Sequence, residues 1–319
     1  MSDLDTAIGR VVTRDDGLDP ARAQAMHATL DLEGPPPGPG ASLPRFWHWA
    51  YFWDAQPPAR LGRDGHPRPG GAEDSPGGFI PDTGLPRRMW AGGAVTWHAP
   101  LILGAAATRS SRIASIERKT GRSGPLVFVT LLHEITGPSG LALRERQDLV
   151  YRPDPSPDPS PDPAPSPDPG TGPSPDPSPD AAAPPPRQAP KDETAMERYA
   201  PDPVQLFRYS ALTFNGHRIH YDLAYCRAVE GYPGLVVHGP MLAQRLIDLA
   251  ARLRPDLAHF AFRAVAPVFC PERFEACARA EGDGLALWIR GADGRLAMTA
   301  SARPEPDPQH AQTPESQAR

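Results

Sequence analysis

The sequence predicts an α+β protein made of two similar halves, in each of which antiparallel strands pack against a helix. In the second half, a buried helix predicted over 240–253 is followed by four strand-like runs. In the first half, an apolar segment near 90–105 with several glycines is predicted to be helical, and strand-like runs follow it as well. The shared order of elements indicates an internal duplication, although the halves show no visible sequence identity.

The segment that separates the halves is predicted to be disordered. It contains 17 of the 44 prolines and six aspartates but almost no large apolar side chain. Such a segment cannot bury enough surface to offset the entropy lost on folding. We therefore expect an N-terminal half over 1–151, a disordered linker over 152–190, a C-terminal half over 191–303 and a disordered tail over 304–319.

Local signals predict the elements of the first half. Asp19 followed by Pro20 is typical of a helix start, and the helix is expected to run to about Leu32. The aromatic cluster Phe46–Trp53 is expected to lie in the core or in the wall of a pocket. Three strands are then predicted, the last with alternating apolar and polar residues. They cover 112–119, 126–135 and 141–151.

In the second half, Phe207–Tyr209 is expected to form a short strand or a lead-in loop. The helix over 240–253 carries its polar residues on one narrow face, so it should be mostly buried. Glycines mark turns between the strand-like runs that follow. These runs are His259–Phe269, Arg273–Ala280, Leu285–Arg290 and Arg295–Ser301.

Composition and charge exclude several classes of protein. The net charge is −5, and most of it comes from the predicted linker. No basic stripe indicates nucleic acid, and no basic cluster or long apolar run indicates a membrane. The three cysteines, Cys226, Cys270 and Cys277, show neither a disulfide framework nor zinc-ligand spacing. The amino terminus lacks an apolar signal core, so a cytoplasmic protein is expected.

A dense polar cluster lies over 213–222, with Asn215, His217, Arg218, His220 and Asp222 within eight positions. Such a cluster can be a polar loop in which Asp222 caps a helix, or it can be a catalytic site. A metal site would need a third ligand at a compatible distance. No HExxH or CxxC motif accompanies the two histidines, so no metal is predicted.

A second cluster, over 231–240, ends at the start of the buried helix with His238 and Gly239. Amide groups at a helix start lack acceptors within the helix, and the helix dipole adds positive potential there. A glycine lets a ligand approach these amides closely. The motif suits an oxyanion or a polarised carbonyl, although it can also be an ordinary Gly-Pro helix start.

Together, "FRYSALTFNGHRIHYD" and "VEGYPGLVVHGPMLA" resemble the MaoC-type hot-dog hydratases and dehydratases. Within that family they are most similar to the hydratases of mesaconyl-C4-CoA (3-methylfumaryl-CoA hydratases) and to the type 2 3-hydroxyacyl-thioester dehydratases. In the first half, "LGRDGHP", "GGFIPDTGLPRRMWAGG" and "ERQDLVYR" carry the same resemblance, which omits only the linker and the tail. It implies a double hot dog, in which each half is an antiparallel sheet wrapped around a long helix.

The resemblance implies a hydro-lyase that hydrates an enoyl thioester or dehydrates a 3-hydroxyacyl thioester, and a short acyl-CoA such as mesaconyl-C4-CoA is the expected substrate. His220 matches the catalytic histidine of the family, whereas Asn215 stands where the general pattern has an aspartate. An amide can orient water but cannot take its proton, so the acid–base role falls on His220. The amides near His238 and Gly239 would stabilise an enolate. CoA or an acyl-carrier phosphopantetheine arrives with the substrate, so no separate cofactor is expected.

Four further residues are candidates for substrate binding. Arg87, Arg88 and Arg218 suit a carboxylate or CoA phosphates, or else they form salt bridges within the protein. Asp222 either orients His220 or caps a helix. His217 is expected to be structural, and Asp64 and His66 are expected to belong to a lid or pocket.

Two other functions stay open from the sequence. One is a hot-dog thioesterase, and the other is an acyl-thioester-binding protein without catalysis, which the amide at Asn215 keeps in play. A monomer and a homodimer are both compatible with the sequence.

Overall fold

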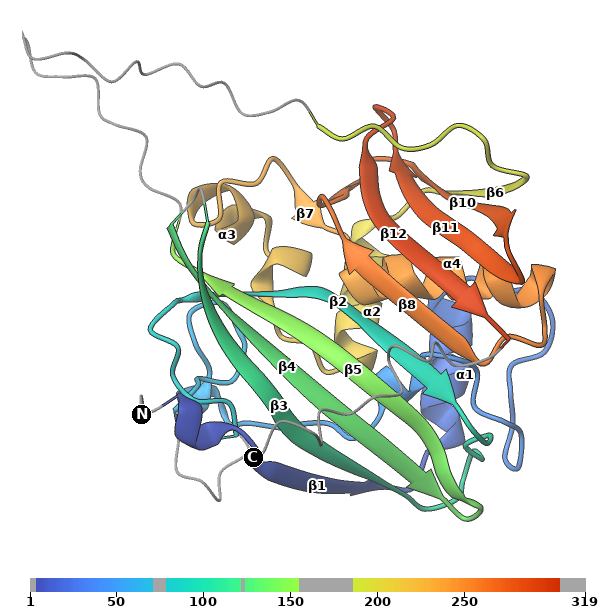
Figure 1. The fold of residues 1–319 in the computed structure, drawn as a ribbon, viewed down its shortest axis with the longest axis horizontal. Helices are drawn as coiled ribbons and strands as arrows, with labels where there is room; N and C mark the ends of the chain where they lie inside the picture. Colours follow the sequence, from blue (N-terminus) through green and yellow to red (C-terminus); the bar gives the residue numbers. More distant parts are fainter. Residues whose placement is uncertain (1–3, 71–78, 122–123, 155–185, 305–319) are drawn as a thin grey trace, which may run out of the picture.

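The computed structural model describes residues 4–70, 79–121, 124–154 and 186–304. Most of the predicted linker (155–185) and of the predicted tail (305–319) lies outside the described residues. The described strands form one ten-stranded antiparallel sheet in the order β1-β3-β4-β5-β2-β8-β12-β11-β10-β6, and Figure 1 shows it running through both halves. A separate two-stranded ribbon pairs β7 with β9.

The strands of the first half agree with the sequence prediction where it named them, since the three predicted runs lie within β3, β4 and β5. Their bounds are β1 Val11–Asp16, β2 Arg87–Trp97, β3 Ala107–Gly121, β4 Gly124–Gly137 and β5 Gly140–Arg152. In the second half, the four predicted runs correspond to β8, β10, β11 and β12, and the first run ends early. The bounds are β6 Ala195–Tyr199, β7 Leu235–Val236, β8 His259–Ala264, β9 Phe269–Cys270, β10 Phe274–Glu281, β11 Gly284–Gly291 and β12 Leu296–Arg303.

The two halves have the same strand order when each is read from its outer edge. In this comparison β1, β3, β4, β5 and β2 correspond in turn to β6, β10, β11, β12 and β8. The halves join where β2 pairs with β8, from Gly92 opposite Arg263 to Thr96 opposite His259. The structure therefore has the internal duplication that the order of elements indicated.

The helix predicted near 90–105 is wrong, because residues 90–97 lie in strand β2 and residues 98–105 form bends and turns. Its glycines serve a close approach between backbones and do not mark a helix. A Cβ on Gly92 would lie 2.6 Å from the Phe262 carbonyl oxygen, and one on Gly93 would lie 2.5 Å from the Arg146 carbonyl oxygen. Only glycine fits at these two places, where β2 lies between its neighbours from both halves.

The helix predicted over 240–253 is confirmed as α4 (Gly239–Leu253). It lies behind the C-terminal strands in Figure 1 and packs against β8, β10, β11 and β12. Met241, Leu246 and Ile247 are among its nearly inaccessible residues, and even Gln244 and Arg245 are buried. The buried helix fixes the position of its own amino terminus, which is part of the site described below.

Three shorter helices are capped by aspartate. They are α1 (Pro20–Thr29), α2 (Pro203–Leu212) and α3 (Leu223–Ala228). The start predicted at Asp19 is confirmed, because its side chain accepts from the Ala21 amide. The strand or loop predicted over 207–209 is wrong, since α2 covers it. Asp202 caps α2 ahead of Pro203, with the same Asp-Pro signature that marks α1.

The first half carries no helix as long as α4 among its described residues. Its ten-residue helix α1 lies against α2 and against the short 3-10 turn η2 (Trp47–Ala50). The aromatic cluster is in the core, as predicted, with Phe46, Tyr51 and Phe52 at most 2% exposed. The inner face of β3, β4 and β5 consequently borders a cavity. The other 3-10 turns are η1 Asp5–Ala7, η3 Pro58–Arg60 and η5 Arg218–His220.

The described part of the second half begins before residue 191. The Ala189 amide donates to the Gly294 carbonyl, and the Leu296 amide donates to the Arg187 carbonyl. Residues 187–189, which the prediction placed in the linker, therefore hold the turn before β12. No helix in the described part of the chain is long and apolar enough to cross a membrane.

Candidate active site

A cavity of about 940 Å³ lies between the two halves. The first half contributes polar residues from loops and from the inner face of its strands, including His66, Arg88, Arg109, His133 and Glu145. The second half contributes Asn215, His217, His220, Val236 and Gly239. The cavity therefore brings together residues of the two polar clusters that the sequence analysis identified over 213–222 and 231–240.

His220 is held in a defined tautomer at the wall of this cavity. Its Nδ1 lies 2.7 Å from the Val236 carbonyl oxygen. Because a carbonyl can only accept, Nδ1 carries the hydrogen and Nε2 keeps its lone pair. The ring is 6% exposed, and burial lowers the pKa of His220 to about 4. At neutral pH this side chain is a neutral imidazole that can accept a proton at Nε2.

His238 supports His220 through its ring. The two rings stack with centroids 3.7 Å apart and planes 17° apart. Nε2 of His238 forms a 2.8 Å hydrogen bond with the Ser210 hydroxyl, which fixes the ring from α2. Burial, together with neighbouring His220, holds the pKa of His238 well below its usual value. A neutral ring stacked in this way restricts the motion of His220 without adding charge.

Asn215 lies beside the same cavity, in the turn after α2. Its Oδ1 accepts from the His217 amide at 3.1 Å, and its own amide donates to the Ser210 carbonyl at 2.8 Å. The side chain is thus held by the backbone, and its amide group has no proton-accepting role near neutral pH. This geometry is compatible with the predicted task of orienting water.

Gly239 is the first residue of α4 and lines the cavity. A Cβ at this position would meet nothing within 4 Å, so open space faces the residue. Pro240 follows it and has no N–H group, which leaves the Gly239 amide as a donor at the very start of the helix. The amide and the helix dipole together suit a developing negative charge on oxygen.

Asp222 and Arg218 are occupied by each other and by local structure. Asp222 accepts from the Tyr225 amide at 2.9 Å and caps α3. Arg218 forms an ion pair with Asp222 at 2.7 Å and also donates to the Arg63 carbonyl. Since His220 donates its Nδ1 hydrogen to the Val236 carbonyl, the structure favours a capping role for Asp222. The substrate-binding prediction for Asp222 and Arg218 finds no support in these contacts.

The two arginines at the start of β2 differ. Arg87 is buried, forms an ion pair with Glu230 and donates to the Tyr232 hydroxyl at 3.3 Å. Arg87 therefore links the two halves through a salt bridge, which is the alternative named in the sequence analysis. Its charge is already paired and is not available to a substrate. Arg88 lines the cavity. After burial, its positive charge is among the causes that lower the pKa of His66.

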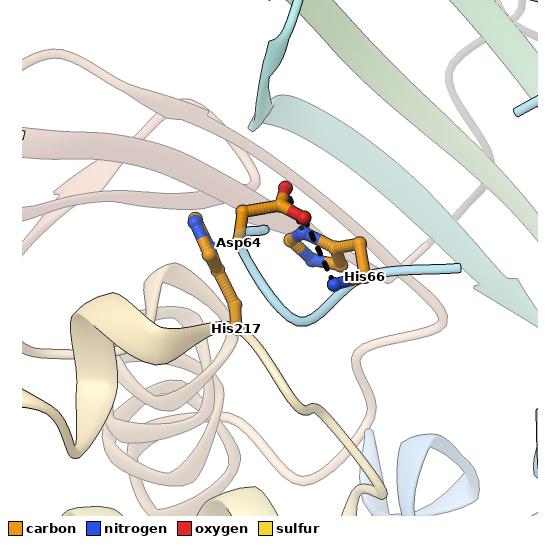
Figure 2. Close-up of side chains that lie close together, drawn as sticks. All are labelled: Asp64, His66 and His217. Carbon is orange, nitrogen blue, oxygen red and sulfur yellow. Dashed lines mark hydrogen bonds and ion pairs between the residues drawn. The ribbon is translucent and has the colours of Figure 1, made fainter. Parts of the chain in front are cut away.

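The loop over 62–66 of the first half lies directly against the loop over 215–218 of the second, as Figure 2 shows for Asp64, His66 and His217. Asp64 Oδ2 and His66 Nδ1 are 2.9 Å apart, and the rings of His66 and His217 are 4.3 Å apart. The sequence prediction that this pair belongs to the pocket agrees with the lining position of His66. Asp64, His66 and His217 place one potential metal ligand each within 4.8 Å of one another.

Several site residues escaped the sequence analysis. The Val236 carbonyl and the Ser210 hydroxyl orient the two histidines, yet a backbone carbonyl and a lone serine carry no sequence signal. The sequence analysis also missed Arg109 on β3. Only the alternating direction of side chains along β3 and β5, which turns Arg109 and Glu145 toward the cavity, could have suggested this residue.

Solved structures with the same fold support this architecture. HtdX of Mycobacterium tuberculosis aligns with 92% of this chain and 99% of its own, at a TM-score of 0.58 and 17% identity. A MaoC-like dehydratase from Phytophthora capsici covers 96% of this chain and 100% of its own, at a TM-score of 0.66 and 12% identity. A Mycobacterium tuberculosis protein described as a double hot-dog fold aligns at a TM-score of 0.51. The protein therefore has the double hot-dog fold.

Within that class, sequence comparison identifies the family. The model of the hydroxyacyl-thioester dehydratase type 2 family matches residues 46–180 and 172–270. The mesaconyl-C4-CoA hydratase of Chloroflexus aurantiacus is 41% identical over 92% of this chain and 95% of its own length. The mitochondrial type 2 dehydratase of Schizosaccharomyces pombe is 35% identical over 28% of this chain and 31% of its own. The chain belongs to the hydroxyacyl-thioester dehydratase type 2 family and is a hydro-lyase.

Proposed function

We propose that the protein catalyses the reversible hydration of a short enoyl-CoA that carries one free carboxylate, of the mesaconyl-C4-CoA kind. One observation carries the catalytic part of the proposal. His220 presents an unprotonated Nε2 to a cavity that is also lined by Gly239, whose amide lies at the start of α4. A proton acceptor and an oxyanion donor in one cavity are the two groups that addition of water to a conjugated thioester requires.

In the hydration direction, water attacks the β-carbon and His220 Nε2 takes one of its protons. The electron pair of the carbon–carbon double bond moves onto the thioester, whose oxygen becomes an enolate oxygen. The Gly239 amide stabilises this charge, an effect commonly worth about 3 kcal/mol. The proton then passes from His220 to the α-carbon, so that the enzyme returns to its starting state. Dehydration is the same sequence in reverse.

The cation content of the cavity supports a carboxylated acyl group. Arg109 donates to the Phe52 carbonyl at 2.9 Å, and its buried Nε has no hydrogen-bond partner among the described residues. Burial lowers the pKa of Arg109 to about 10, so the guanidinium stays charged at neutral pH. The nearby carboxylate of Glu145 is already bound by His48 and Trp49. Arg109 therefore remains to meet a substrate carboxylate, and Arg88, which also hydrogen-bonds the Tyr151 side chain, is a second cation that lines the cavity.

The reaction as proposed needs no resident metal ion. Asp64, His66 and His217 have the residue types of a metal site, but His66 Nδ1 already forms a hydrogen bond with Asp64. The experiment is to dialyse the purified protein against a chelator and to measure bound metals and turnover. Unchanged turnover without metal supports the proposal, and turnover that is lost and restored by a divalent ion contradicts it.

A substrate panel tests the proposed function directly. The purified protein is offered mesaconyl-C4-CoA, crotonyl-CoA and the corresponding 3-hydroxyacyl thioesters, and enoyl absorbance is followed. We expect loss of enoyl absorbance with no release of free thiol. Thiol release would instead identify a thioesterase, and binding without any change in absorbance would identify a non-catalytic protein.

A further inference from the structure

His66 places a second imidazole at the cavity, and the Asp64 carboxylate positions it. The Asp64 carboxylate accepts from the His66 amide at 3.1 Å through Oδ1 and faces His66 Nδ1 at 2.9 Å through Oδ2. Although burial opposes it, the bonds from His66 lower the pKa of Asp64 and keep this carboxyl ionised. An ionised carboxylate can only accept, so the hydrogen is on Nδ1 and the lone pair of His66 is on Nε2.

The loop that carries this pair is fixed against the loop over 215–218 of the second half. The Arg218 amide donates to the Asp64 carbonyl at 2.8 Å. Gly65 has a φ of +90°, and a Cβ there would lie 1.9 Å from the Gly216 carbonyl oxygen. Only glycine allows this contact. Gly65 therefore touches Gly216, the residue after Asn215, and His66 comes directly after this contact point.

The rings of His66 and His220 both lie next to the ring of His217. Ring centroids are 4.3 Å apart for His66 and His217, and 5.5 Å apart for His217 and His220. His66 and His220 both line the cavity. Each has its Nδ1 tied to an oxygen acceptor from its own half, so both rings present Nε2 as an acceptor.

A water molecule that attacks the β-carbon gives one proton to His220 and keeps the other as the hydrogen of the new hydroxyl. This second hydrogen needs a hydrogen-bond acceptor while the carbon–oxygen bond forms. A family aspartate could accept from it, but Asn215 stands at that position, and its Oδ1 is already bound to the His217 amide. We infer that His66 Nε2, oriented by Asp64, is the second acceptor for the attacking water, so that the catalytic pair is divided between the two halves. This inference rests on the proposed hydration reaction.

This assignment defines the role of each residue in dehydration. His220 removes the α-proton, and its imidazolium delivers that proton to the departing hydroxyl, which leaves as water. His66 holds the remaining hydrogen of that hydroxyl during cleavage of the carbon–oxygen bond. Loss of His66 should therefore slow the carbon–oxygen step and leave α-proton removal in place. Asp64 acts as a positioning residue, because it acts through His66.

The experiment uses a 3-hydroxyacyl thioester in deuterium oxide and compares the wild type with His66→Ala, Asp64→Asn and His220→Ala. Elimination is followed by absorbance, and deuterium at the α-carbon of unreacted substrate is followed by mass spectrometry. For His66→Ala we expect kcat to fall about 10²-fold with little change in KM. The ratio of deuterium exchange to elimination should rise about tenfold or more. His98→Ala, an exposed histidine outside the cavity, is the matched control.

Wild-type turnover is measured first, because its absence rejects the proposed function itself. With an active wild type, full turnover by His66→Ala overturns the role of His66. Equal losses of exchange and elimination also overturn it, since that pattern indicates a structural role. If His66→Ala does not fold, the nearly isosteric Asp64→Asn decides in the same way. It should raise the ratio of exchange to elimination, and an unchanged ratio contradicts the inference.

Discussion

The imidazole rings of His220 and His238 stack face to face, with their centroids 3.7 Å apart. One ring is bonded to the Val236 carbonyl and the other to the Ser210 hydroxyl, so the pair is fixed from two different elements. Such a stack tolerates a neutral His220 well and a charged one poorly, because both rings are buried. The stack thus favours the free-base form that the reaction needs at its start.

Replacing the proposed base should abolish turnover without unfolding the protein. We expect His220→Ala to lower kcat by about 10²- to 10⁴-fold, the usual contribution of a general acid–base group. Enoyl absorbance at saturating substrate measures the loss, and circular dichroism checks the fold. Wild-type turnover in this variant would show that another group is the base.

Asn215→Asp tests whether position 215 belongs to the water-activating pair. The carboxylate keeps the acceptor oxygen for the His217 amide and adds a second oxygen that can take a proton. We therefore expect kcat to be retained or to rise. A fall of about 10²-fold or more would show that the amide hydrogens of Asn215 are themselves required.

The arginines of the cavity should separate carboxylated from simple substrates. Arg88→Met and Arg109→Met each remove a charge that a substrate carboxylate would meet. A charge-assisted hydrogen bond contributes about 1.5–3 kcal/mol. We expect kcat/KM for mesaconyl-C4-CoA to fall about 10- to 100-fold for at least one variant, while that for crotonyl-CoA changes little.

Arg144→Met is the matched control for these variants, because Arg144 pairs with Glu134 on the exposed side of the hairpin. Equal losses for both substrates in the Arg88 and Arg109 variants would contradict carboxylate recognition and would indicate general damage to the cavity.

Asp222→Ala should affect stability more than chemistry. Asp222 caps α3 and pairs with half-buried Arg218, and loss of such a cap destabilises the helix start. We expect a lower urea midpoint with kcat close to that of the wild type. If kcat collapsed while the midpoint stayed unchanged, Asp222 would have to act on His220 after all.

The acid side of the pH profile should reflect the lowered pKa of His220, which burial brings to about 4. The neutral base is the active form, so kcat/KM should hold from pH 7 to about 5 and fall as the pH drops through about 4. An acid limb centred near 6.5 would show an ordinary histidine instead. Activities are normalised to the folded fraction at each pH.

Stability should fall over a related range. Burial also lowers the pKa of His133 to about 4, whereas an unfolded histidine titrates near 6.5. Below about pH 6.5 the unfolded chain therefore binds more protons than the folded chain. The stability that the neutral histidines provide is complete above that pH and is lost as the pH falls toward 4. Urea midpoints at pH 7.5, 6 and 5 measure the effect, and a flat series would contradict it.

The sequence predicted well those features that depend on local pattern. The alternation in β5, the buried helix α4 and the cap at Asp19 are decided by neighbouring residues, and the motif around His220 carried the family. Strand β2 was missed because its glycines are needed for close backbone contacts with β5 and β8, which are distant in sequence. The ion pair of Arg87 with Glu230 was equally inaccessible, because the two residues are distant in sequence and meet only in the tertiary fold. The helix α2 was within reach, since Asp202 and Pro203 repeat the signature used for α1.

The pairing of β2 with β8 also determines how the protein can be divided. Each of these strands is interior in the whole sheet, but each would become a bare edge if its half were made alone. Such an edge presents unpaired amide and carbonyl groups that readily recruit another strand. Either half in isolation would therefore tend to aggregate or to pair with itself, whereas the two halves produced together as separate polypeptides would complement each other through this edge. Because His66 and His220 come from different halves, recovered activity would report that reassembly.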